Sequence, residues 1–252
     1  MHKLKEQIVC FFKTTLKDFL SLNQIDPSWL TVWTIIYLSF LTIDLFVVDF
    51  WFSSALKYLG ILLCLIYAHQ KAPKDWQLFC ALLFTFFADT ILVWTKYEFL
   101  GVMVFCIAQF FHTYRLTGDS HKSHFALYVM SLITIYFFAR LFGVESLYAI
   151  TAIYAFELLL NAFIARENYF TRHEDPHARC AFYGYILFLG CDLCVGLRHL
   201  ILDGLLPQQF LPLIAFMVWV FYYPSQVLLS NSSTIQQKVK RTAQIKPNKI
   251  AK

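Results

Sequence analysis

The chain has 252 residues, of which 59% are hydrophobic and only 15% are charged, and its mean hydropathy is +0.57. Ordinary soluble domains are roughly half apolar and a quarter charged, so this composition argues against a water-soluble globule. It also excludes a collagen-like chain or any long disordered region. Because one membrane-spanning helix takes about 20 apolar residues, the chain could form seven or eight such helices and leave no separate soluble domain.

Residues 1–24 predict an amphipathic helix that lies on the membrane surface. The hydrophobic side chains that recur there at helical spacing are Ile8, Phe11, Phe12, Leu16, Phe19 and Leu20. Lysines occupy other positions of this segment, which suits an anionic membrane surface. A solvated terminal helix is the alternative, and the absence of a small-residue cleavage site argues against a signal peptide.

Long apolar segments between short charged joints predict eight membrane-spanning helices within residues 25–230. The expected spans are approximately 29–48, 52–68, 76–94, 98–115, 124–142, 145–165, 180–200 and 210–229. Short joints make consecutive helices antiparallel neighbours, and the continuous apolar segments argue against a β-barrel. We therefore expect an all-α integral membrane protein, a single bundle of about eight transmembrane helices, followed by a basic tail over residues 231–252.

Lysines and arginines are divided unequally between the two ends of this bundle. Of the 21, 17 belong to the termini and to the joints near residues 70, 118 and 172, whereas four, Lys57, Lys96, Arg140 and Arg198, belong to the other end. Positive side chains favour the cytoplasmic side of a membrane. The division predicts both termini in the cytoplasm, and it accounts for the net charge of +5 without nucleic-acid binding.

Seven cysteines lie mostly inside the expected spans and do not predict a disulfide framework. Cys191 and Cys194 form a CxxC pair, but this pair lies in an apolar helix without a second CxxC or a matching histidine pair. No cluster of histidine, cysteine and carboxylate has the spacing of metal ligands. We therefore expect no metal and no other cofactor.

Two aspartates lie deep inside expected spans, Asp89 in LFTFFADTILVW and Asp192 in YILFLGCDLCVGL. A carboxyl that faces lipid costs several kcal/mol, so its presence predicts a function. Counted from Trp76 and Cys180, the two lie 13 and 12 residues into their spans, or roughly 18 to 20 Å. Two close carboxyls in a poorly solvated bundle repel until one holds a proton, and such a pair can act as general acid and base. The alternative is a structural role in hydrogen bonds between helices.

Further polar side chains inside the spans predict the lining of a binding site. The candidates for substrate binding are Lys57, His112, Tyr154, Tyr223 and Gln226. Tyr154 shares one helix face with Glu157 and Asn161. His112 is expected closer to the cytoplasmic face than the aspartates, which suits a lining or headgroup role. For Lys57 the alternative is an ammonium group that snorkels to the membrane interface.

Several of these residues form a pattern that resembles the YhhN family of membrane proteins, a lysoplasmalogenase-like family. The family's first signature has an aspartate late in one span, then phenylalanine and glycine at the start of the next, which ends with histidine and tyrosine. The matching residues here are Asp89, Phe99, Gly101, His112 and Tyr114.

The resemblance extends from about residue 30 to residue 230. LFLGCD resembles the second signature, YYPSQVLLS resembles the final span, and Lys57 matches a lysine that is typical of the family. The chain departs from the pattern at two positions, because Ala88 stands where the family usually has glycine and Cys191 where it usually has serine.

This resemblance implies an ether hydrolase that cleaves the vinyl ether bond of lysoplasmalogen to a fatty aldehyde and glycerophospho-ethanolamine or -choline. A vinyl ether resists bases but yields to an acid that protonates its β carbon, which leaves an oxocarbenium ion for water to trap. The reaction therefore needs a proton donor and an anion, as in glycosidases. The resemblance implies Asp89 and Asp192 for these roles, and the sequence leaves open which of them is the acid.

The sequence leaves two positions open for the lipid phosphate. Lys57 and Arg198 are the candidates at the outer side, and His112 and Arg115 are the candidates at the cytoplasmic side. Two other functions are alternatives to the hydrolase. An intramembrane aspartyl protease would be expected to carry a GxGD sequence, which FFAD lacks. A transporter or lipid-binding protein would use the same aspartates as proton or ion sites.

Overall fold

The computed structural model describes residues 26–46, 50–117, 130, 133–134, 136–172 and 174–233. All regular structure within them is helical, and seven helices are long and apolar enough to span a membrane. These are α2 (Pro27–Phe46), α3 (Phe50–Lys71), α4 (Trp76–Trp94), α5 (Glu98–Thr117), α7 (Ser146–Thr171), α8 (Pro176–Leu202) and α9 (Leu211–Ser230), and the 3₁₀ turn η1 (Gln208–Phe210) precedes the last. The expected all-helical, multi-pass fold is confirmed.

Three of the sequence-based expectations fall wholly or largely outside the described residues. These are the surface helix over residues 1–24, the span over residues 124–142 and the basic tail beyond residue 233. Of the span 124–142, residues 130, 133–134 and 136–142 are described, and all of these except residue 142 are helical.

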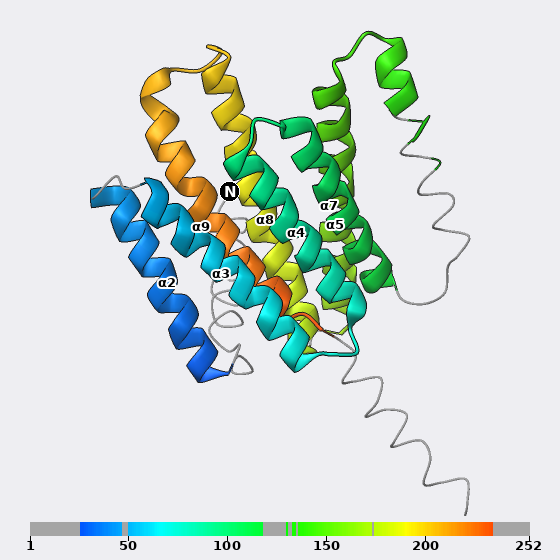
Figure 1. The fold of residues 1–252 in the computed structure, drawn as a ribbon. Helices are drawn as coiled ribbons and strands as arrows, with labels where there is room; N and C mark the ends of the chain where they lie inside the picture. Colours follow the sequence, from blue (N-terminus) through cyan, green and yellow to red (C-terminus); the bar gives the residue numbers. More distant parts are fainter. Residues whose placement is uncertain are drawn as a thin grey trace, which may run out of the picture.

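Six of the described helices form a closed ring, and the seventh packs on its outside (Figure 1). Going around the ring, α3 contacts α4, α4 contacts α5, α5 contacts α7, α7 contacts α8, and α8 contacts α9, which closes the ring against α3. Helix α2 packs against α3 and α9. The main hydrophobic core takes side chains from all seven helices, among them Phe40, Cys64, Ala88, Phe105, Leu158, Phe188 and Tyr222.

The bundle has two ends, which we name after residues that lie there. The Asp75 end holds Asp75, Asp175 and residues 231–233, where Ser233 donates a hydrogen bond to Asp75. The Trp94 end holds Trp94 and Trp51, whose ring centroids are 5.1 Å apart. Helices α4 and α8 both run from the Asp75 end toward the Trp94 end, so their side chains can meet at one level of the bundle.

Two aspartates begin the helices that carry the candidate catalytic residues. The carboxylate of Asp75 accepts a hydrogen bond of 3.1 Å from the backbone N–H of Leu78, and that of Asp175 accepts one of 3.0 Å from His177. Both are favourable N-caps, and Pro176 occupies the first turn of α8, where its missing N–H costs nothing. The expected start of this span at residue 180 was therefore wrong by four residues.

Small residues allow α9 to approach its neighbours closely. A Cβ atom on Gly60 of α3 would lie 2.1 Å from Cε2 of Tyr223, and one on Gly184 of α8 would lie 2.9 Å from Cγ of Leu229. Glycine in a membrane bundle commonly serves such close helix contacts. These two glycines therefore allow α9 to pack closely against α3 on one side and against α8 on the other.

Helix α9 contains a proline whose effect on the backbone is compensated by α2. Pro224 has no N–H and cannot bond to the carbonyl of Val220, four residues earlier. The hydroxyl of Tyr37 donates a hydrogen bond of 3.0 Å to that carbonyl oxygen. Tyr37 also stacks on Tyr223 at 5.5 Å between ring centroids. The buried carbonyl is thus satisfied by a side chain.

Residues 231–233 connect α5 to the start of α4 at the Asp75 end of the bundle through hydrogen bonds. Arg115 of α5 donates to the carbonyl oxygen of Ser232 at 2.8 Å and to its hydroxyl at 2.9 Å. The hydroxyl of Ser233 donates to Asp75 at 2.7 Å, next to α4. All three residues of the segment are buried, with exposed fractions of 9% or less.

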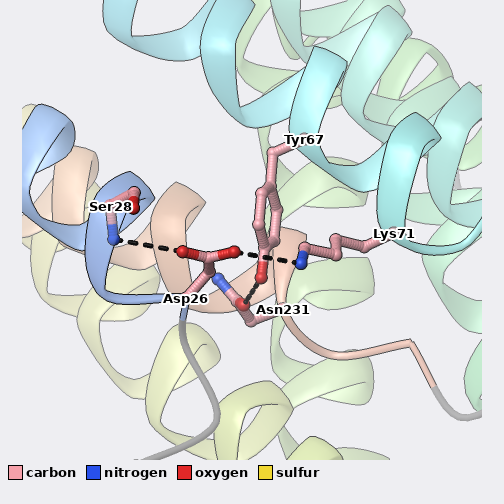
Figure 2. A network of polar contacts seen from close by, with 5 residues as sticks. All are labelled: Asp26, Ser28, Tyr67, Lys71 and Asn231. Atoms are coloured by element: carbon pink, nitrogen blue, oxygen red, sulfur yellow. Dashed lines mark hydrogen bonds and ion pairs between the residues drawn. The ribbon is translucent and has the colours of Figure 1, made fainter.

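Figure 2 shows the part of this end where α2 and α3 meet the segment. Tyr67 donates a hydrogen bond of 2.7 Å to the side chain of Asn231. Asp26 accepts one of 3.1 Å from the backbone N–H of Ser28 and forms an ion pair of 3.3 Å with Lys71. The hydrogen bond from Ser28 and the Lys71 ammonium together lower the pKa of Asp26 from its ordinary value.

Candidate functional site

Asp89 lies on α4 and faces the interior of the ring, with 8% of the residue exposed. Its Oδ2 accepts a hydrogen bond of 2.5 Å from the hydroxyl of Tyr222 on α9. Tyr222 is held by aromatic contacts with Phe188 of α8 at 5.7 Å and Trp219 at 5.4 Å between ring centroids. The carboxyl therefore has a fixed hydrogen-bond donor from across the ring.

Asp192 lies on α8 beside the side chain of Tyr154 on α7, and the two interact. Its Oδ2 is buried and has no hydrogen-bond partner among the described residues. Asp192 lies 16 residues after Pro176, and Asp89 lies 13 residues after Trp76, or roughly 24 and 20 Å into their helices. Counted from the observed starts of α4 and α8, the depths of Asp89 and Asp192 therefore differ slightly more than the sequence analysis expected.

Both aspartates interact with one side chain, that of Cys191. The carboxyl groups of Asp89 and Asp192 both act electrostatically on its thiol. Their tyrosine partners, Tyr222 and Tyr154, also interact electrostatically with each other. Four helices, α4, α7, α8 and α9, thus contribute to one cluster, which we call the aspartate cluster: Asp89, Cys191 and Tyr222, which are buried, and Tyr154 and Asp192, which are partly buried.

A third carboxyl lies next to this cluster. Glu157, one turn after Tyr154 on α7, is fully buried and interacts with the thiol of Cys106 on α5. Tyr154 lies close to the same cysteine. The sequence signal for Glu157 was its spacing of three residues from Tyr154, which placed it on the inward face without assigning it a role.

A second buried polar group lies toward the Asp75 end, and we call it the Arg115 group: His112, Arg115 and Tyr185. The rings of His112 on α5 and Tyr185 on α8 meet edge to face, with 5.8 Å between their centroids. Both residues are fully buried. Neither ring nitrogen of His112, nor the hydroxyl of Tyr185, has a hydrogen-bond partner among the described residues. The charge of Arg115 acts electrostatically on both side chains.

Between the two groups, α5 and α7 are joined by amide side chains. Asn161 donates to the side-chain oxygen of Gln109 at 2.9 Å and accepts from the hydroxyl of Thr113 at 2.8 Å. Gln109 and Asn161 are both fully buried. The predicted inward orientation of Asn161 is therefore explained by a contact between helices.

The remaining sequence-based candidates contact residues outside the aspartate cluster. Lys57 is buried, with 8% exposed, and forms an ion pair of 2.7 Å with Asp44 of α2. Its ammonium group lies 4.9 Å from the ring centroid of Trp219. Tyr223 faces α3 and α2, and the fully buried Gln226 donates a long hydrogen bond of 3.4 Å to Ser225. The sequence analysis missed Asp44 as the partner of Lys57, because the sequence alone does not show which side chains of α2 face α3.

A sequence profile of the YhhN family matches residues 51–233. The chain belongs to the YhhN family. The part of the chain matched by the YhhN profile contains the whole aspartate cluster and the whole Arg115 group, and it excludes α2, so the match begins later than the expected start near residue 30. No curated protein and no solved structure matches the chain. Among the described residues, no three histidine, cysteine or acidic side chains are arranged to hold a metal ion.

Proposed function

We propose that this YhhN protein is a membrane-embedded hydrolase that cleaves the vinyl ether bond of lysoplasmalogens. The observation that carries the proposal is the aspartate cluster, in which two carboxyls from different helices both act electrostatically on the thiol of Cys191 and each has its own tyrosine. Acids inside a membrane protein are costly and usually functional. Membership of the family supports a lipid substrate.

The two carboxyls supply the two groups that vinyl ether hydrolysis needs. One aspartic acid transfers its proton to the β carbon of the vinyl ether, and the π electrons of the double bond form the new C–H bond. The ether oxygen then shares the positive charge of the resulting oxocarbenium ion. The other aspartate, as a carboxylate, stabilises that charge and removes a proton from the water that attacks the α carbon. In the hemiacetal, the Asp192 carboxylate takes the hydroxyl proton while Asp89 gives its proton to the glycerol oxygen, whose bond to carbon breaks. A fatty aldehyde and a glycerophospho-alcohol are released, and both carboxyls return to their starting states.

We assign the proton to Asp192 and the carboxylate role to Asp89. Each carboxyl has a tyrosine partner, but Oδ2 of Asp192 is buried and no donor from the described part of the chain reaches it, so a proton on that oxygen displaces no hydrogen bond. Asp89 accepts a short hydrogen bond from Tyr222, and hydrogen bonds donated to a carboxylate favour its charged form. Tyr222 is in this account a positioning residue that acts through Asp89.

The function is tested by aldehyde release from 1-alkenyl lysophospholipid, with ethanolamine and choline headgroups, by the purified full-length protein in detergent. In D₂O the mechanism predicts one deuterium on the carbon next to the aldehyde, because the proton is added there. In H₂¹⁸O it predicts a glycerophospho-alcohol without ¹⁸O, because the glycerol oxygen is never replaced. Folded protein that releases no aldehyde from either headgroup would favour a transporter or lipid-binding protein.

A further inference from the structure

Arg115 is a buried cation that has no acidic partner among the described residues. The residue is 8% exposed, and within the described ranges two of its nitrogens donate to Ser232 and to no other residue. Its third nitrogen, Nε, has no hydrogen-bond partner in this part of the chain. Removing a charge from water without a counter-ion is costly. The position of Arg115 therefore suits an anionic ligand.

The neighbours of Arg115 add further polar groups that lack partners. His112 and Tyr185 are fully buried, and the imidazole and hydroxyl can each donate a hydrogen bond. Buried polar groups are nearly always hydrogen-bonded, so both call for a ligand with acceptor oxygens. A phosphate provides several such oxygens, and arginine binds phosphate in a well-defined geometry.

Neither of the two cations at the outer position is buried without a counter-ion, because Arg198 is exposed and Lys57 is already neutralised. The ammonium group of Lys57 lies 2.7 Å from a carboxylate oxygen of Asp44, and it also lies over the ring of Trp219. A phosphate at that position would have to displace the carboxylate or sit beside a negative charge. Of the two positions that the sequence left open, the structure therefore favours the one at the Asp75 end.

The distance between the two buried groups fits the headgroup of a lysophospholipid. Tyr185 and Asp192 are seven residues apart on α8, which separates their Cα atoms by about 10 Å. In the substrate, five single bonds separate the vinyl ether oxygen from phosphorus, which is roughly 6 Å. This is less than the separation of the two Cα atoms, and the side chains of Asp192 and Tyr185 can extend toward the substrate to make up the difference. On α5, Gln109, His112 and Arg115 recur every three residues along the same path.

We propose that Arg115, with His112 and Tyr185, binds the phosphate group of the lysophospholipid while its vinyl ether lies at the aspartate cluster. This inference rests on the proposed function for the identity of the lipid. The hydrocarbon chain then extends from the aspartate cluster toward the Trp94 end, and the lipid enters with its headgroup at the Asp75 end.

The kinetic test compares two substrates that differ only in the phosphate headgroup, 1-alkenyl lysophosphatidylethanolamine and 1-alkenylglycerol. Arg115→Gln should raise KM for the phospholipid by about 10- to 100-fold, the range for one lost hydrogen bond to a charged group, and should leave KM for 1-alkenylglycerol within a factor of about two. Arg115→Lys should fall between, since it keeps the charge but not the geometry. The matched control is Arg166→Gln, because Arg166 is an exposed arginine on α7. An equal change in KM for both substrates, or no change, would overturn the inference and leave the hydrolase intact.

A binding experiment tests the phosphate site at Arg115 even if the protein releases no aldehyde. The probe is a 1-alkyl lysophospholipid, whose saturated ether cannot be protonated to an oxocarbenium ion, and its affinity for the parent protein and for Arg115→Gln is measured by native mass spectrometry. Loss of affinity in Arg115→Gln, with 1-alkylglycerol unaffected, supports the phosphate site. Equal affinity in both proteins would overturn it. Binding of inorganic phosphate at Arg115 as tight as that of the lipid would overturn the assignment to a lipid headgroup.

Discussion

At the scale of residues, the aspartate cluster gives its two carboxyls different surroundings. Asp89 accepts a hydrogen bond from Tyr222, whereas Asp192 has one buried oxygen without a donor. If Asp89 is the anion, a small external anion should replace it, and if Asp192 is the acid, an anion should not replace it. We expect sodium azide to restore aldehyde release by Asp89→Ala several-fold and to leave Asp192→Ala inactive.

This rescue experiment has a built-in comparison, because both variants remove the same carboxyl group and differ only in position. Aldehyde is measured at increasing azide concentration, with sodium chloride at equal ionic strength as the control. Rescue of Asp192→Ala alone would exchange the two assignments.

The two aspartates could be chosen as candidate site residues from the sequence, because an acid within an apolar helix is conspicuous. Their partners Tyr222 and Tyr154 could not, because nothing in one sequence tells which of 14 tyrosines faces which acid.

At the scale of helices, the position of α9 depends on close contacts at glycine. An added methyl group at Gly60 would overlap the ring of Tyr223, whereas Gly196 of α8 has open space around its Cα. Alanine in place of glycine otherwise favours a helix by about 0.5 to 1 kcal/mol. We expect Gly60→Ala to lower the thermal unfolding midpoint in detergent and Gly196→Ala to leave it unchanged or raise it. A midpoint that rises equally in both variants would contradict the tight α3–α9 contact.

The contact between α2 and α3 has an electrostatic part that depends on pH. The pKa of Asp26 is lowered from its ordinary value of 3.8, first by the hydrogen bond from Ser28 and then by Lys71. A carboxyl with a lowered folded-state pKa stabilises the fold above its ordinary pKa, and this stabilisation disappears as the pH falls through the lowered value. The side chain is exposed, so the effect is small and screened by salt.

Asp26→Asn should therefore lower the thermal midpoint slightly at pH 7 and low salt, and the difference from the parent protein should vanish at pH well below 3.8. Intrinsic tryptophan fluorescence in detergent measures the midpoint, and 1 M sodium chloride at pH 7 is the control that should remove most of the difference. A difference that persists in acid and in salt would mean that Asp26 acts through packing and not through charge.

At the scale of the whole molecule, the number and order of the described spans could be predicted, since long apolar segments have few alternatives in a membrane. The ends of helices were harder to predict. Asp175 and Pro176 start α8 inside a charged joint that resembled a loop. The closed ring could not be predicted, because helix order along the chain does not determine which distant helices meet. The burial of Ser232 within a polar C-terminal stretch was equally unforeseen.

The whole-molecule account depends on two carboxyls from α4 and α8 acting on one bond, and one measurement tests it most directly. Aldehyde release from 1-alkenyl lysophospholipid is compared between the purified parent protein, Asp89→Asn and Asp192→Asn, with Asp203→Asn, an exposed aspartate at the end of α8, as the control. The account predicts activity in the parent and the control and a loss of at least about 100-fold in each of the other two, with thermal midpoints retained. Full activity in either Asp89→Asn or Asp192→Asn, or no aldehyde from the folded parent protein, would contradict it.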